Sequence, residues 1–399
     1  MVYLLVGLGF YGVGVWYDSL KKKDIVREYM VNSNKRDRFE EAFERGQRGD
    51  ISNYEAWLQD QGIRPDRVTE AFVAQYFREQ PEYAGNHEDN LEDVAEFLGF
   101  FSRREGPYHI PVLGVTGIGK TQFLGTIQHM LDQLDIGLPY REYSAVRFGE
   151  DTEEGEPYWD DVLAEVADLE KAVILLDDCD GDKRIDHSLE TISSRVEDVF
   201  VITAWTPERW RMCKDEITET LPVSQEVALT PLGEAATIEA LQATMEAFSR
   251  EAVEIPTDLY QRIYRYSFGI PALFHLLLRK TLRETFLQGL ELGDGDAVEA
   301  AVQTLHLDGV EERVYDLSEK QLLILKHILL ARHPQGRRPS ELVELLDRDK
   351  STISYHLQNL TDAHILEKEK AGRSTFYRVY APVKPIVQRR VAQEGEFHA

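Results

Sequence analysis

The chain has 399 residues, 43% of them apolar, so it can bury sizeable cores, and its length predicts two to three domains. Its 71 Asp and Glu against 45 Lys and Arg give an extreme net charge of −26. Only Cys179 and Cys213 are present, with no pairing pattern and no C-x-x-C, which excludes a disulfide scaffold and a structural zinc site and indicates a reducing compartment.

Residues 2–17 are sixteen positions without a charge, followed by three lysines at 21–23. As a helix rising about 1.5 Å per residue, this stretch falls slightly short of a hydrocarbon core about 30 Å thick. With Trp16 and Tyr17 at the interface, residues 1–23 predict a single membrane anchor that leaves the remainder in the cytoplasm. A buried hydrophobic segment is the alternative. Residues 7–12 also match G-x-G-x-x-G, but basic, helical sequence follows where dinucleotide binding needs a second strand.

Residues 24–90 are polar and helical in rhythm, with breaks at Gly49, Gly62, Pro65 and Pro81, and predict a small helical adaptor. A helix expected over 92–102 then leads into the next domain.

The most informative stretch is PVLGVTGIGKT at 111–121, which matches the P-loop pattern G-x-x-x-x-G-K-[ST] in full. Such glycines let backbone N–H groups curl around a phosphate, the lysine supplies a charge for the β and γ oxygens, and the hydroxyl ligates Mg²⁺. A strand expected over 108–113 and a helix over 121–134 give the context that the motif requires, against the alternative of a chance glycine turn. We therefore expect a phosphate-bearing nucleotide and Mg²⁺ as cofactors, bound by Gly114, Gly117, Ile118, Gly119, Lys120, Thr121 and Gln122.

Further strands are expected over 140–148, 172–177, 199–205 and 226–230, with helices between them. This alternation predicts an α/β fold, a parallel sheet covered by helices, for residues 91–230. The strand at 172–177 ends in two carboxylates, the Walker B pattern. Asp177 is expected to hold Mg²⁺ and Asp178 to polarise the attacking water; Asp180 is the less favoured third participant and is assigned to the surface.

In additional-strand P-loop ATPases, a polar residue on the strand between the two Walker motifs reads the γ-phosphate. Here the stretch VFVITAWTP offers Thr203, which we favour, and Thr206, with a purely structural role as a further alternative. Arg195, Arg209 and Arg211 are candidates for an arginine finger, although an ordinary surface role is the default for each.

After residue 230 the strands stop, and helices expected over 234–248, 258–266 and 272–288 predict a helical lid at 231–290. Residues 289–296, GLELGDGD, are the most linker-like stretch of the chain, and residues 291–316 are expected to form a linker with one more helix over 297–307.

The segments GVTGIGKT, LLDD, VITAWTP, VALTPLGEAAT and SFGIPALFHLLLRK together resemble the AAA+/STAND group of ATPases over about 92–290, especially archaeal members with a C-terminal winged helix. The resemblance implies an ATP- and Mg²⁺-dependent switch in which the 269–271 turn, including Pro271, lines the nucleotide base. Ala272 stands where many members have a second sensor arginine, and Arg279 is the nearest substitute. The surface composition, with 15 Lys against 30 Arg, is similar to that of proteins from salt-loving archaea; an ordinary acidic cytosolic protein is the alternative.

Residues 317–390 predict a winged helix-turn-helix, ahead of a tail at 391–399. Helices are expected over 320–330, 340–346 and 349–360, and a hairpin follows over 365–379. The pattern resembles ArsR- and MarR-like regulators, with two departures: His364 replaces a usual glycine, and Asp347 and Asp349 bring negative charge beside the DNA-facing turn. Core residues repeat at helical spacing in the third helix and turn other side chains outward. The expected DNA contacts are Thr352, Ser354, Tyr355, Gln358, Lys370 and Arg373.

Residues 316–390 hold 14 Lys and Arg against 9 Asp and Glu and form a basic region in an acidic chain. This favours DNA as the partner of the winged helix, because phosphate contacts supply most affinity. We expect a slow regulatory ATPase that couples nucleotide state to duplex DNA binding. The alternatives are an origin-recognition-like replication or plasmid-maintenance initiator, and a membrane-tethered ATPase whose winged helix contacts protein. Nucleotide-dependent self-association is an open expectation.

Overall fold

The structure is a computed structural model that describes residues 50–79, 87–134, 138–144, 171–181, 185–196, 198–331, 333 and 335–397. It divides into two compact units, Met1–Pro65 and Asp66–Ala399. The expected anchor at 2–17 lies outside the described residues and stays a prediction. Among the residues that are described, none of the helices is both long and apolar enough to cross a membrane. The first unit contributes helix α2 (Asp50–Asp60).

A five-stranded parallel sheet forms the centre of the second unit, in the order β2-β3-β4-β1-β5. This confirms the predicted α/β fold, because all five expected strands are present and β2 is followed as far as Ser144. One strand, β4, separates the P-loop strand β1 from the aspartate strand β3. The bounds are β1 (Tyr108–Leu113), β2 (Tyr140–Ser144), β3 (Lys171–Asp177), β4 (Asp198–Trp205) and β5 (Val227–Ala228).

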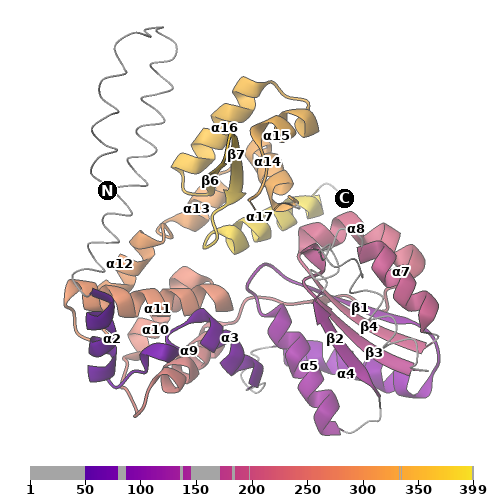
Figure 1. Cartoon of the computed structure of the whole chain (residues 1–399), viewed down its shortest axis with the longest axis horizontal. Coiled ribbons are helices and arrows are strands. Elements are labelled where there is room, and N and C mark those ends of the chain that lie inside the picture. The colour runs from indigo at the N-terminus through magenta and orange to yellow at the C-terminus, as the bar shows by residue number, and fades with distance from the viewer. Residues whose placement is uncertain are drawn as a thin grey trace, which may run out of the picture. The chain divides into compact units, whose positions relative to one another are not determined.

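Helices cover both faces of this sheet (Figure 1). Alternate residues of β3 and β4, such as Ile174 and Val201, share one buried cluster with α7 (Ile185–Arg195) and α8 (Pro207–Thr220). The opposite face packs on α4 (Glu88–Arg103) and α5 (Lys120–Leu134), where the rings of Phe101 and Phe200 lie 5.5 Å apart. Strands buried on both faces read as continuous apolar runs, which is the pattern that the sequence shows.

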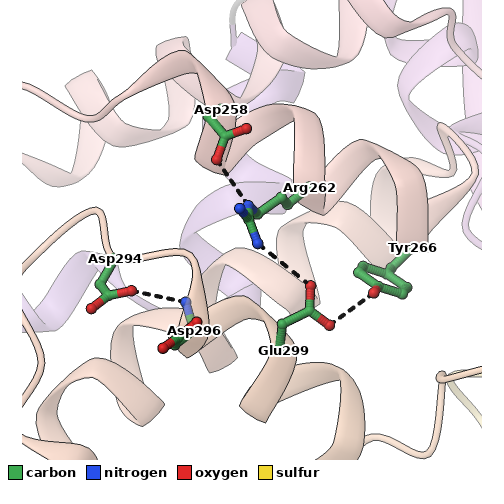
Figure 2. A network of polar contacts seen from close by, with 6 residues as sticks. All are labelled: Asp258, Arg262, Tyr266, Asp294, Asp296 and Glu299. Carbon is green, nitrogen blue, oxygen red and sulfur yellow. Dashed lines mark hydrogen bonds and ion pairs between the residues drawn. The ribbon is translucent and has the colours of Figure 1, made fainter.

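The lid consists of α9 (Glu234–Phe248), α10 (Thr257–Ser267), α11 (Pro271–Gln288) and α12 (Asp296–Thr304). Figure 2 shows how α12 is joined to α10: Arg262 pairs with Asp258 at 2.8 Å and with Glu299 at 3.8 Å, and Tyr266 donates to Glu299 at 2.8 Å. At Gly295 a Cβ would meet the Arg262 guanidinium at 2.8 Å. Gly293 and Gly295 therefore allow close packing, whereas Gly289 ends α11 in a left-handed conformation, and α12 packs on the lid.

The second unit also contains α3 (Glu70–Glu79) near its start and a winged helix near its end. An isolated antiparallel bridge joins Arg337 to Tyr377 of the two-stranded hairpin. As expected, Ile353, Leu357 and Leu360 are buried. The elements are α13 (Val310–Tyr315), α14 (Glu319–Leu329), α15 (Pro339–Leu346), α16 (Lys350–Asp362), β6 (Leu366–Ala371), β7 (Ser374–Val379) and a closing helix that the sequence pattern did not predict, α17 (Lys384–Phe397).

Candidate nucleotide site and winged-helix surface

The P-loop joins β1 to α5 and lines a cleft of about 840 Å³. Its curl depends on Gly117 and Gly119, whose φ angles of 77° and 108° are ones that side chains disfavour. A Cβ on Gly117 would also lie 2.5 Å from the Cβ of Ala272 in the lid. Gly117, Ile118, Gly119, Thr121 and Gln122 all line the cleft, as expected for the nucleotide-binding set. Gly114 closes the end of β1, where its N–H donates to Trp205 O at 3.1 Å.

Lys120 lies at the floor of the cleft. Its ammonium donates to the carbonyl oxygens of Gly114 at 2.8 Å and Val115 at 3.2 Å. Burial lowers the pKa of Lys120, whereas the carboxylates of Asp180 and Asp177 act against this shift. The lysine therefore lies among carboxylates that favour its charged form.

The ends of α5 and β3 meet beside Lys120. The Thr121 hydroxyl donates to Asp177 Oδ2 at 2.5 Å, and the Asp178 N–H donates to Asp177 Oδ1 at 2.9 Å. Asp178 has a φ of 55° and an exposed side chain that borders the cleft. Partial desolvation and the neighbouring Asp177 carboxylate raise its pKa. The structure thus brings together the residues expected to handle Mg²⁺ and water.

The assignment of Asp180 to the surface was wrong. The chain turns through a short 3-10 helix, Cys179–Gly181, in which Cys179 is buried and Asp180 is directed back to the cleft. Its carboxylate accepts the Thr206 N–H at 2.9 Å and so holds the start of α8. A strand pattern alone does not reveal such a turn.

Thr203 does not reach the cleft. Side chains alternate along a strand, and Thr203 pairs in register with Leu176, which faces α7 and α8. Its hydroxyl lies 2.8 Å from His109 Nε2 and accepts the Trp205 indole N–H at 2.7 Å. The threonine that lines the cleft is Thr206, one position after the strand.

Helix α11 of the lid touches the P-loop directly. The Ala272 N–H donates to Gly117 O at 3.1 Å, and Pro271 lines the cleft at the first position of the helix. Arg279, the nearest substitute for a second sensor, also borders the cleft, where it pairs with Glu70 of α3 at 3.4 Å.

Helix α3 closes another side of the cleft with Val73, Phe77 and Arg78. The Gln122 side chain donates to Phe77 O. No motif marks this contribution, because α3 lies in the stretch that reads only as a generic helical adaptor.

The arginine candidates are placed elsewhere. Arg209 is buried on α8, and Arg211 donates to Ala392 O in α17 at 2.8 Å; neither lines the cleft. Arg195 ends α7, and its side chain lies outside the described ones.

The donor set fits a magnesium nucleotide. A hydroxyl and a carboxylate 2.5 Å apart stand next to a loop of N–H groups and a lysine. Within the described part of the chain no three His, Cys, Asp or Glu residues are grouped to hold a metal by themselves. Mg²⁺ bound with nucleotides usually takes one or two protein ligands and completes its shell with phosphate oxygens and water, so a sparse protein set agrees with this cofactor.

The expected DNA contacts differ in accessibility. Ser354, Tyr355 and Gln358 are exposed on α16, with Tyr355 at 64%, and Lys370 and Arg373 are exposed at the hairpin. Thr352 is half-buried, and its hydroxyl donates to Asp349 at 2.7 Å. Thr352 therefore takes part in the hydrogen bonds that cap the start of α16.

The two departures from the regulator pattern have structural roles. Asp349 caps α16 by accepting the Thr352 N–H at 2.9 Å, and hydrogen bonds from Ser351 and Thr352 lower its pKa. His364 adopts a φ of 55°, as its replacement of glycine predicts, and its ring stacks on His306 at 3.7 Å. Sequence reasoning missed Lys350, an exposed cation at the first turn of α16.

A family model described as a winged helix DNA-binding domain matches residues 317–381. Comparison with curated proteins gave no match. Among solved structures, the chain is similar to the Aeropyrum pernix ORC1 protein in complex with DNA, with 15% identity over 79% of this chain and 94% of that chain and a TM-score of 0.47. It is also similar to the RuvB Holliday junction branch migration motor of Thermotoga maritima, with 17% identity over 74% of this chain and 92% of that chain and a TM-score of 0.42. A third similar structure is Drosophila ORC bound to DNA, with 13% identity over 80% of this chain and 91% of that chain and a TM-score of 0.42.

These identities and TM-scores give no ground for assigning a role to this chain. The fold is carried by the chain's own features: the sheet order, the P-loop after β1, the paired aspartates after β3, the helical lid and the winged-helix match. Together they define an α/β fold with a P-loop on a five-stranded parallel sheet, a helical lid and a C-terminal winged helix.

Proposed function

We propose that this protein is an ATP-binding and ATP-hydrolysing switch whose nucleotide state controls the binding of duplex DNA by its winged helix. The observation that carries the proposal is the shared cleft. The P-loop, the Thr121–Asp177 pair, the lid residue Pro271 and residues from the start of α17 all border it. A change in the cleft can therefore act on both the lid and the DNA-binding domain.

Within this proposal each residue has a role. Lys120 holds the β and γ phosphate oxygens, and Thr121 and Asp177 hold the metal ion, which when bound supplies charge neutralisation at the transferring phosphoryl group. Asp178 orients and polarises the attacking water. Thr206, whose N–H is held by Asp180, takes the γ-phosphate-reading role in place of Thr203.

The arginines of the cleft support slow turnover. The only arginines among the described residues of the cleft are Arg78 and Arg279, and Arg279 is paired with Glu70. An arginine finger speeds phosphoryl transfer by about 10³–10⁵ when supplied in cis or in trans. We therefore propose slow hydrolysis by the isolated chain and faster hydrolysis when a second copy contributes its arginine.

The DNA side of the proposal rests on the winged helix. Its model match is to a DNA-binding domain, and its exposed side chains on α16 and the hairpin are suited to base edges and phosphates. Lys350, Lys370 and Arg373 have no ion-pair partner among the described residues, so their charges are available to phosphates.

Two specific roles are compatible with this ATP-binding and DNA-binding function. A regulator would bind scattered promoters, whereas a replication or plasmid-maintenance initiator would bind one locus. Sequencing the DNA retained by the purified native protein distinguishes them by the number and location of the bound sites.

The nucleotide site is tested by Lys120→Ala. The variant should lose at least about 100-fold in affinity for a fluorescent ATP analogue, because it removes a charge that contacts phosphate in a poorly hydrated cleft. Lys326→Ala, which removes an exposed lysine from α14, is the matched control and should bind like the wild type. Wild-type affinity in Lys120→Ala would refute the P-loop assignment.

A further inference from the structure

Helix α17 follows the winged-helix match yet contacts the P-loop through one buried amide. The Gln388 side chain is 1% exposed. Its Oε1 accepts the Thr116 N–H of the P-loop at 2.7 Å, and its Nε2 donates to Glu208 Oε1 of α8 at 2.6 Å. One side chain thus ties the last helix of the chain to both the P-loop and the start of α8.

This contact is specific because each end of the amide has a matching partner. Glu208 is buried, and desolvation raises its pKa while the Gln388 hydrogen bond acts against that shift. Removing Gln388 would leave a buried carboxylate and a loop N–H without this partner. A buried polar group left without a hydrogen-bond partner costs more free energy than the intact hydrogen bond contributes.

Lys384 lies one helical turn before Gln388, and positions four residues apart share a helix face. It borders the cleft together with Thr116, Lys120, Asp178 and Asp180, and its charge lowers the pKa of Glu208. Among the described residues its ammonium has no hydrogen-bond or ion-pair partner. It is therefore a cation on the lining of the cleft, close enough to the Glu208 carboxylate to act on its pKa.

We propose that Lys384 contacts the terminal phosphate of bound ATP and that Gln388 is the positioning residue that fixes α17 on the P-loop. The inference rests on the proposed nucleotide site and assigns part of that site to α17, the helix that follows the winged-helix match. The lysine then distinguishes ATP from ADP, and its helix carries that difference to the DNA-binding domain.

The test compares ATP and ADP binding by the full-length chain, using fluorescent analogues at low salt. Lys384→Ala should weaken ATP about tenfold and ADP by less than about twofold, because only ATP has the third phosphate. Lys384→Arg keeps the charge and should retain most of the ATP preference. Gln388→Met should also reduce the ratio of ATP affinity to ADP affinity. The double variant Lys384→Ala with Gln388→Met should have the same ratio as Lys384→Ala alone, because both substitutions remove the same contact to the terminal phosphate.

Arg389→Ala is the charge-matched control, since Arg389 lies on the same helix but pairs with Glu311. It should leave the ATP-to-ADP ratio unchanged. A normal ratio in Lys384→Ala, with binding still lost in Lys120→Ala, would overturn this inference and leave the nucleotide site standing. A Gln388→Met variant that loses thermal stability but keeps the ratio would refute the positioning role. A wild-type chain that binds neither nucleotide would refute the proposed function as well.

Discussion

Side-chain alternation along β4 decides which threonine can meet a nucleotide. The strand places Thr203 with Leu176 on the α7 and α8 face, and Thr206 follows the strand into the cleft. Residues 117–121 could be predicted because the P-loop chemistry is local in sequence. The contact between Thr116 and Gln388 spans 272 positions, and no local pattern reports such a pairing.

At the same scale, His109 predicts a pH-dependent stability. It is fully buried, and desolvation lowers its pKa to about 4, whereas the unfolded chain takes up this proton near its ordinary pKa of 6.5. The unfolded state therefore binds more protons below pH 6.5, and stability falls as pH drops from 6.5 towards 4. At pH 5 the loss from this residue is about 2 kcal/mol relative to pH 8.

Urea unfolding of the wild type and His109→Gln at pH 8 and pH 5 measures this loss. The difference in unfolding free energy between the two pH values should be smaller in the variant by about 2 kcal/mol. His275, whose pKa burial lowers to about 3, contributes in both proteins and cancels in the comparison. Equal pH dependence in both proteins would show that His109 titrates normally in the fold.

Element by element, the sequence pattern predicted the sheet, the lid and α14 to α16, because their apolar residues are periodic and glycine or proline marks their ends. It did not identify α17, whose sequence KPIVQRRVAQEGEF mixes polar and apolar residues. It also suggested a linker at 289–296, where the glycines allow α12 to pack on Arg262. Patterns report local preference, whereas these two elements are defined by what they pack against.

The β6–β7 hairpin, which forms the wing of the winged helix, carries the exposed Arg373. Arg373→Ala should weaken duplex DNA binding severalfold and reduce the slope of log affinity against log salt by about one, because one phosphate contact is lost. Arg378→Ala is a matched control in the same hairpin, since Arg378 is paired with Glu367 at 2.7 Å. Titrations of labelled duplex at several salt concentrations measure both. Equal slopes for Arg373→Ala and the wild type would favour a protein partner for this domain.

Across the whole molecule, the charge is distributed unevenly. A chain with a net charge of −26 repels nucleic acid in general, whereas residues 316–390 carry a basic balance. The helix that ends this region borders the nucleotide cleft, so the two sites are physically joined. Under the proposed function, the coupling free energy between the two sites is reciprocal, so DNA must change ATP affinity by the same factor by which ATP changes DNA affinity.

The central claim is tested most directly by the affinity for one labelled duplex at fixed salt, with a non-hydrolysable ATP analogue and with ADP. The wild type should show affinities that differ by about tenfold, a coupling of about 1.4 kcal/mol, and Lys120→Ala should show no difference. Equal affinities of the wild type in both nucleotide states would contradict a nucleotide-controlled switch.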